Sequence, residues 1–138
     1  MTNNILVDTN IWLDIILKRE GFYEKSLNSI ETLISRGFNI FLTATTITDI
    51  YYIAKRQLKD EQFVKNTIRD LIKSFQIIPV DKERLTQALF LAVEDFEDSI
   101  QVSAGFSMRC EYILTRNVKD FENTLLIPIT PMQLLEKM

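Results

Sequence analysis

Short apolar runs alternate with longer stretches of helical periodicity along most of the chain. The apolar runs predict strands at residues 4–8, 38–43, 76–80, 111–115 and 125–129. Runs of this length with little polar alternation are typical of strands that are buried on both faces of a parallel sheet. Pro79 falls within the third run and indicates an edge strand or the end of a strand.

Helices are predicted between these strands, at residues 10–18, 22–36, 46–58, 61–75, 81/82–94 and 96–109, with a short last helix that opens at Thr130-Pro131. Gly37 follows the second helix as a C-cap, and Thr130 is an N-cap with Pro131 at the first helical position. Strands that alternate with helices predict an α/β fold, a three-layer α/β/α sandwich with a central parallel sheet of about five strands.

The size and composition are those of one soluble globular domain. We expect the 138 residues to form a single domain over residues 1–138, since 46% are hydrophobic and 25% are charged. No transmembrane segment or signal-type N-terminus is recognisable. Cys110 is the only cysteine, which excludes an intrachain disulfide and favours a reducing compartment, so a cytoplasmic location is expected.

The absence of histidine excludes several chemistries. No Ser-His-Asp or Cys-His catalytic unit and no His-ligated zinc site is possible, and one cysteine cannot form a thiolate cage. Oxygen ligands remain, and they suit hard cations such as Mg²⁺ and Mn²⁺. There is no GxxxxGK[ST] or GxGxxG motif. A net charge of −3 gives no global attraction to nucleic acid, so such a contact would be local or mediated by a metal ion.

Asp8 is the most informative residue. It ends the apolar run Ile5-Leu6-Val7 and is followed by Thr9-Asn10 and a helical pattern. The last residue of such a strand points toward the crevice beyond the carboxyl ends of the sheet, where open α/β folds bind ligands. An ionised carboxylate is costly there unless a cation or hydrogen-bond donors compensate it. Asp8 is therefore a candidate metal ligand.

Asp49 is the only charged residue between Arg36 and Lys55. Its apolar neighbours indicate a largely buried environment, in which an acid needs a partner. The alternative is an acid near a helix N-terminus, where the helix dipole favours it. Helical phase supports that alternative, because Asp49 lies off the face formed by its apolar neighbours. Both interpretations stay open.

Asp98 belongs to an acidic cluster, Glu94, Asp95, Glu97 and Asp98, at the head of a helix. Residues 99–108 carry no charge and include small side chains, which predicts close packing of this helix against the sheet. Acids at a helix N-terminus are common for dipole reasons alone. Periodicity does not fix which of the four acids faces a site, and we prefer Asp98 because it enters the uncharged stretch.

The segment 115–121 (Thr-Arg-Asn-Val-Lys-Asp-Phe) follows the fourth strand and is either a site loop or an ordinary polar loop. Asp8, Asp49 and the pair Asn117 and Asp120 each follow a strand, so they are expected at one edge of the sheet, with Asp98 on a nearby helix. Carboxylates gathered there would repel one another, and a divalent metal ion would resolve the conflict.

These motifs, in this order and over almost the whole chain, resemble PIN-domain nucleases and, more closely, the VapC-type ribonuclease toxins. The resemblance implies an endoribonuclease that depends on Mg²⁺ or Mn²⁺, with a five-stranded parallel sheet. It also implies an RNA substrate, a separate protein antitoxin and a homodimer. Asp8, Asp49 and Asp98 would occupy the first three acidic positions of the family.

Two departures from the family pattern are visible. Asp49 stands where glutamate is usual, and Asn117 stands where aspartate is frequent, which leaves Asn117 or Asp120 for the fourth position. Asp8 and Asp98 are the expected direct metal ligands, with Asp49 bound directly or through water. Thr9 and Asn10 would orient Asp8 or contact phosphate at the helix N-terminus, and Arg116 would contact phosphate.

Rival functions differ in what they require. A catalytically silent PIN-like interaction module would keep the acids only as remnants. A phosphoryl-transfer enzyme of the haloacid dehalogenase type needs Asp-x-Asp after the first strand, where this chain has Asn10. A receiver domain needs paired acids after the first strand and a lysine after the fifth, and both are missing.

Overall fold

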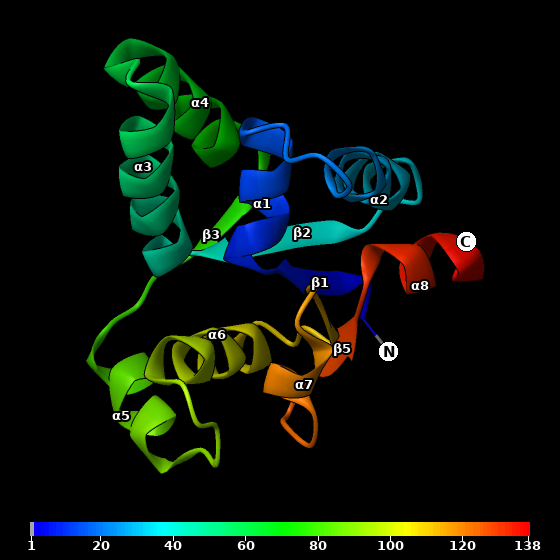
Figure 1. Ribbon diagram of the computed structural model, residues 1–138. Helices are drawn as coiled ribbons and strands as arrows, with labels where there is room; N and C mark the ends of the chain where they lie inside the picture. The colour runs from blue at the N-terminus through cyan, green and yellow to red at the C-terminus, as the bar shows by residue number, and fades with distance from the viewer. Residues whose placement is uncertain (1) are drawn as a thin grey trace.

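The computed structural model describes residues 2–138 and shows a five-stranded, all-parallel sheet between two layers of helices (Figure 1). The strands are β1 (Asn4–Val7), β2 (Asn39–Thr43), β3 (Gln76–Ile78), β4 (Tyr112–Leu114) and β5 (Ile127–Ile129). Their order across the sheet is β3-β2-β1-β4-β5, so the central strand is the first in the chain. The predicted three-layer α/β/α architecture with about five parallel strands is confirmed.

Helices cover both faces of this sheet (Figure 1). The helices are α1 (Thr9–Ile16), α2 (Tyr23–Ser35), α3 (Ala44–Leu58), α4 (Glu61–Ser74), α5 (Lys82–Phe90), α6 (Phe96–Ser107), α7 (Val118–Phe121) and α8 (Pro131–Lys137). Figure 1 shows α1, α2 and α8 on one side of the sheet, and α6 and α7 on the other. Within residues 2–138, no helix has the length and apolar character needed to cross a membrane.

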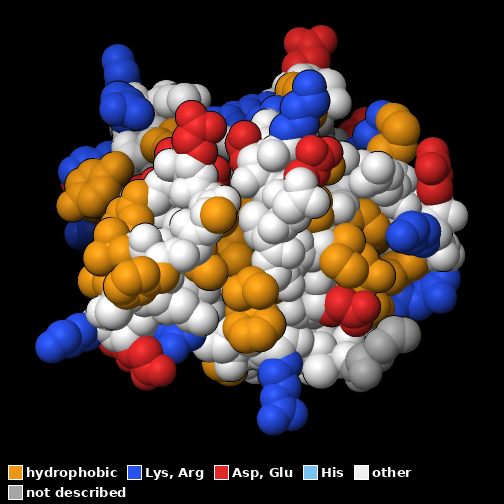
Figure 2. All heavy atoms as spheres, turned by 90° about the horizontal axis from the view of Figure 1, so that it is seen from below, with side chains coloured by type: hydrophobic (Ala, Val, Ile, Leu, Met, Phe, Trp, Pro, Cys, Tyr) orange, Lys and Arg blue, Asp and Glu red, His pale blue; other side chains and the backbone are white. Residues whose placement is uncertain are grey.

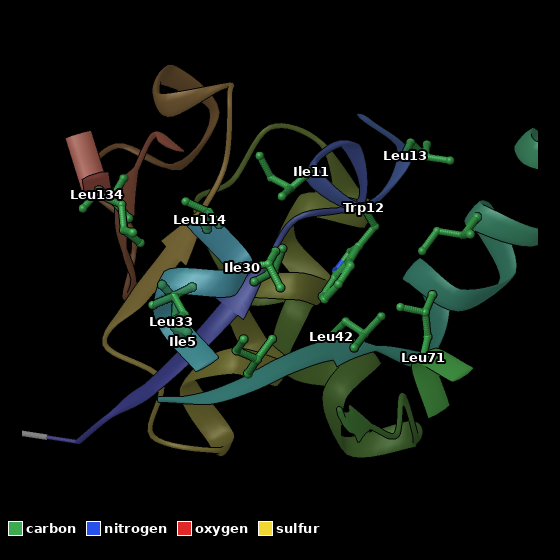
Figure 3. Packing of buried hydrophobic residues seen from close by; sticks show 14 residues of the cluster. Ile5, Ile11, Trp12, Leu13, Ile30, Leu33, Leu42, Leu71, Leu114 and Leu134 are labelled. Atoms are coloured by element: carbon green, nitrogen blue, oxygen red, sulfur yellow. The ribbon is translucent and has the colours of Figure 1, made fainter. Parts of the chain in front are cut away.

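Alternate residues of β1, β2, β3 and β4 enter two separate hydrophobic clusters. Ile5 and Val7 of β1 pack with α1, α2 and α8, in the cluster that Figure 3 shows around Trp12 and Ile30. Leu6 points the opposite way and packs with Val102 of α6 in the second cluster. Because side chains alternate between the faces of a strand, a strand covered on both sides must be apolar throughout. This explains the uninterrupted apolar runs of the sequence.

Helix α6 lies very close to the sheet, as its small and uncharged residues predict. A Cβ atom added at Gly105 would meet Leu126 Cδ1 at 2.8 Å and Leu6 Cδ2 at 3.1 Å. The first distance is shorter than real Cβ contacts, so a larger residue at that position would force the ends of the Leu126 and Leu6 side chains to shift. The approach matters for function, because the same helix carries Asp98.

Two predicted helix ends are confirmed. Gly37 follows α2 with φ +77°, and the N–H of Phe38 donates to the carbonyl of Leu33 at 3.0 Å, as in a Schellman motif. Thr130 caps α8 and forms a reciprocal capping box with Gln133, with Pro131 inside the first turn.

Some boundaries differ from the prediction. The helix expected to reach Glu94 ends at Phe90, because Leu91 is extended and the segment turns so that Leu91 and Val93 pack against the second cluster. Asp95 then caps α6. Residues 118–121 form the short helix α7 inside the predicted loop. The third strand ends at Ile78, just before Pro79, and lies at the edge of the sheet as expected.

Candidate active site

The carboxyl ends of β1 and β4 define the centre of the site. The chain winds from β1 through β2 to β3, then crosses the sheet to β4 and β5, so the winding direction reverses between β1 and β4. Ligands of open α/β sheets bind at such a switch point. Asp8 directly follows β1 and Thr115 directly follows β4, and the Asp8 N–H donates to the Leu114 carbonyl at 2.9 Å. The two segments are thereby held side by side.

The carboxylate of Asp8 is buried and fixed by donors from three segments. Its Oδ1 accepts from the backbone N–H of Thr9 at 2.8 Å and from Nε2 of Gln101 at 2.9 Å. Its Oδ2 accepts from the hydroxyl of Thr115 at 2.8 Å. Asp8 is only 6% exposed, so these bonds compensate much of the desolvation of its charge. The carboxylate is also the N-cap of α1, where the helix dipole favours it.

Gln101 and Thr115 were not among the predicted site residues. Thr115 lies within the motif noted after the fourth strand, and its position at a strand end next to β1 could have indicated a contact with Asp8. Gln101 is the largest polar side chain in the uncharged part of α6 and lies three residues after Asp98. Residues three apart share a helix face, so the spacing from Asp98 could have indicated that Gln101 lies near the site.

Asp98 lies close enough to Asp8 and Asp120 to be affected by their charges. Burial, followed by the charges of Asp8, Asp95 and Asp120, raises the pKa of Asp98 to about 7. Asp98 and Asp120 also line one cavity of about 710 Å³ together with Lys119. The structure therefore brings Asp98 of α6 near Asp8, which follows β1, and near Asp120 of α7.

Asp49 lies in the second turn of α3, close to Glu97 of α6. The hydrogen bond between the two carboxyl groups, together with burial and the charges of Asp49, Asp95 and Asp98, raises the pKa of Glu97 to about 8. Glu97 belongs to the acidic cluster at the head of α6, but no feature of the sequence singles it out from the other three acids. Its partner could be identified only from the fold, since α3 and α6 lie far apart in the chain.

Threonine hydroxyls surround the start of α1. The hydroxyl of Thr9 bonds that of Thr46 at 2.9 Å, and Thr46 in turn accepts from Thr43 at 3.1 Å. Asn10 uses its side-chain oxygen to accept from Arg19 at 3.1 Å. Asn117 is exposed and begins α7, and its backbone N–H donates to the Thr115 hydroxyl at 3.0 Å. The backbone N–H of Thr9 therefore orients the Asp8 carboxylate. The Asn117 side chain makes no hydrogen bond within residues 2–138.

Arg116 is engaged in an ion pair that was not predicted. Its Nε donates to Oδ2 of Asp14 at 2.9 Å and its Nη2 to Oδ1 at 3.1 Å. Asp14 is fully buried, and Ser26 of α2 also donates to it at 3.2 Å. The Arg116 guanidinium additionally stacks 3.9 Å from the ring centre of Phe22. This ion pair ties the loop after β4 to α1 and α2, and leaves both N–H groups of Nη1 and one N–H of Nη2 of Arg116 for a ligand.

The donor set at the switch point suits a hard divalent cation. Asp8, Asp98 and Asp120 supply only carboxylate oxygens, which are the ligands that Mg²⁺ and Mn²⁺ accept. Burial and, after it, the charges of Asp8, Asp95 and Asp120 raise the pKa of Asp98, and a bound cation would offset both effects. As the side chains lie, no three acidic or cysteine side chains in residues 2–138 close around a common metal position. The chemistry of the residues fits such an ion, and the carboxylates would have to draw together to bind it.

Known proteins are similar to this chain in sequence and in fold. The PIN domain family matches residues 4–119. The chain is 24% identical over 141 residues to ribonuclease VapC1 of Aquifex aeolicus (strain VF5), a match that covers 99% of this chain and 96% of that protein. The structure of VapBC2 from Rickettsia felis bound to a promoter DNA fragment has a TM-score of 0.73 at 16% identity, over 92% of this chain and 98% of the other.

A third relative is Mycobacterium tuberculosis VapC20, described as a toxin that cleaves the sarcin-ricin loop. Its TM-score is 0.62 at 11% identity, over 79% of this chain and 86% of that one. Together these likenesses show that the protein has a PIN-like α/β fold.

Proposed function

Because the chain belongs to the PIN domain family, we propose that it is a metal-dependent endoribonuclease that hydrolyses RNA phosphodiester bonds. The observation that carries this proposal is the grouping of Asp8, Asp98 and Asp120 at the switch point of the parallel sheet. The ribonuclease name of the Aquifex aeolicus relative, which aligns over nearly the whole chain, supports it. Mg²⁺ or Mn²⁺ is the proposed cofactor.

Each acidic residue has a proposed role. Asp8 and Asp98 would hold the ion directly, and Asp120 rather than Asn117 would fill the fourth position, because Asp120 lies near Asp98. The ion, when bound, would polarise a phosphoryl oxygen and make a water molecule more acidic. Asp49, which lies close to Glu97, would bind the ion through water, or directly once its carboxyl group no longer bonds Glu97. The buried donors around Asp8 keep its carboxylate oriented without the ion.

Substrate contacts are proposed at the start of α1 and after β4. Thr9 and Asn10 lie beside Asp8, and Asn10 has its amide Nδ2 available, since only its oxygen bonds Arg19. Arg116 would reach a phosphate through Nη1, because Nε and one N–H of Nη2 are bonded to Asp14. A strong phosphate contact from Arg116 would therefore need no break in the buried ion pair.

The first prediction tests the reaction. Asp8→Asn removes one charge from the metal site at nearly unchanged size, so RNA cleavage in Mn²⁺ should fall by about 10²-fold or more. Purified wild-type and variant proteins would be incubated with a panel of RNAs, with Mn²⁺ and with a chelator. The matched control is Asp70→Asn, an exposed acid on α4 that should cleave like the wild type.

Two results would contradict the assignment. Equal cleavage by wild type and Asp8→Asn would exclude Asp8 from the site. A well-folded wild type that neither cleaves RNA nor binds Mn²⁺ in a calorimetric titration would instead favour the silent interaction module.

We further propose that the protein is the toxin of a toxin–antitoxin pair, acts as a homodimer and is inhibited by a separate protein antitoxin. The relative from Rickettsia felis, whose structure is a VapBC complex, supports this role. Exposed hydrophobic side chains supply surface for protein partners: Leu89 is 70% exposed and Phe90 is 84% exposed at the end of α5. Figure 2 shows hydrophobic patches on the face seen from below, separated mainly by uncharged side chains and backbone. Clustered exposed apolar side chains are typical of protein interaction sites.

The second prediction tests the toxin role in cells. Induction of the chain alone should arrest growth of a bacterial host, because RNA would be cleaved without an inhibitor present. Asp98→Ala at the same soluble level should let the culture grow. Normal growth with abundant soluble wild-type protein would contradict the toxin role and leave the nuclease assignment to the RNA assay. Light scattering would test the homodimer, with an expected mass of two chains.

A further inference from the structure

Gln101 is a buried amide with a single hydrogen-bonding partner. It lies in the middle of α6, is 2% exposed, and its Nε2 donates to Asp8 Oδ1 at 2.9 Å. Its Oε1 is buried as well and accepts no hydrogen bond within residues 2–138. The other buried polar side chains of this helix bond elsewhere, Ser99 to the Ala88 carbonyl and Ser103 to Gln87. Of these three side chains, Gln101 is the one that bonds a residue of the acidic site, Asp8.

The chemistry of the contact fixes the orientation of the amide. An ionised carboxylate only accepts hydrogen bonds, so the NH₂ group must face Asp8 and Oε1 must face away. A buried acceptor without a partner costs free energy, and an apolar side chain of the same shape would avoid that cost. The fold alone therefore gives no reason for glutamine at this position. The hydrogen bond to Asp8 does.

The position of Gln101 links the two proposed direct ligands of the ion. Asp98 and Gln101 are three residues apart and share a face of α6. One turn of the helix therefore carries both Asp98 and the donor that holds Asp8. Because Gly105 lets α6 lie close to β1, this short link can span the gap between helix and strand. The spacing of the two carboxylates is then set by the packing of α6 on the sheet.

We infer that Gln101 is a positioning residue, which holds the Asp8 carboxylate at a fixed place relative to Asp98 so that the two can bind a divalent cation. This inference rests on the proposed metal-dependent function. Thr115 acts on the other oxygen of the same carboxylate. Donors behind a metal ligand orient that ligand, and their loss typically lowers metal affinity about 10–100-fold.

The test measures Mn²⁺ binding by the full chain, with free Mn²⁺ followed by electron paramagnetic resonance. Gln101→Met keeps the length and volume of the side chain but removes the donor, and it should weaken Mn²⁺ binding about tenfold or more. Thr115→Val should weaken it similarly. The double variant should lose less than the product of the single losses, because both side chains hold one carboxylate. Ser103→Ala is the matched control, a buried polar residue of the same helix, and should bind like the wild type.

A merely structural role predicts a different pattern. It would lower the melting midpoint of the metal-free protein in Gln101→Met and leave the Mn²⁺ affinity of the folded protein unchanged. That result, or a loss equal to that of Ser103→Ala, overturns the inference while the nuclease proposal stands. If Gln101→Met does not fold, Gln101→Asn, whose amide is one methylene too short to reach Asp8, must show the same loss. A wild type that binds no Mn²⁺ overturns the metal site and the inference together.

Discussion

Asp98 combines half-burial with like-charged neighbours, and its pKa is about 7 as a result. In the unfolded chain an aspartate titrates near 4. The metal-free native state therefore holds a proton on Asp98 at pH values where the unfolded chain has lost it. A carboxyl group with a raised pKa contributes stability below its unfolded pKa, and that contribution is lost as the pH rises through the folded pKa. Glu97 acts in the same direction, since its pKa is raised to about 8.

The third prediction follows from this loss of stability as the pH rises. The melting midpoint of the metal-free protein should fall as the pH rises from about 5 to about 8, through the folded-state pKa of Asp98. Asp98→Asn should flatten the dependence, because the amide does not titrate, and the remainder should come from Glu97. Calorimetry at constant ionic strength with a chelator present measures both. Identical pH profiles for the two proteins would mean that the pKa of Asp98 is not raised in the folded protein.

Individual elements show how far the sequence predicts this structure. The apolar runs predict the five strands because a strand covered on both faces leaves no place for alternation, and the sheet has them in parallel. Caps at Gly37 and Thr130 are local features, so they were predictable from neighbouring residues. The end of α5 was not, because Leu91 and Val93 leave the helix for a distant core. Tertiary packing decided that boundary.

Some contacts of the site could likewise be predicted from the sequence and others could not. Asp8 and the segment after β4 were predictable neighbours, because parallel strands bring their carboxyl ends to one edge. The pairing of Asp49 with Glu97 depends on how α3 and α6 sit relative to each other, which no local pattern contains. The ion pair between Arg116 and Asp14 joins residues 102 positions apart. Such contacts become visible only when the helices are placed on the sheet.

The acidic site affects the stability of the whole molecule. In the metal-free state the charges of Asp8 and Asp120 disfavour the ionised form of Asp98. A cation that binds only the native state stabilises that state. At about one hundred times its dissociation constant, a ligand adds roughly 2.7 kcal/mol to the free energy of unfolding. For a chain of this length, the melting midpoint should rise by roughly 5–15 °C.

The fourth prediction is that Mn²⁺ or Mg²⁺ produces this rise and that Asp8→Asn loses most of it, because the variant has lost a ligand charge. The rise should also shrink as the pH falls below 7, since protons compete with the ion for Asp98. Melting curves at several metal concentrations and constant ionic strength measure the effect, with sodium chloride as the screening control. A sodium salt that gives the same rise would indicate general screening of a chain with net charge −3. So would an undiminished rise in Asp8→Asn, because screening acts on the whole charge of the molecule and a bound ion acts at one site.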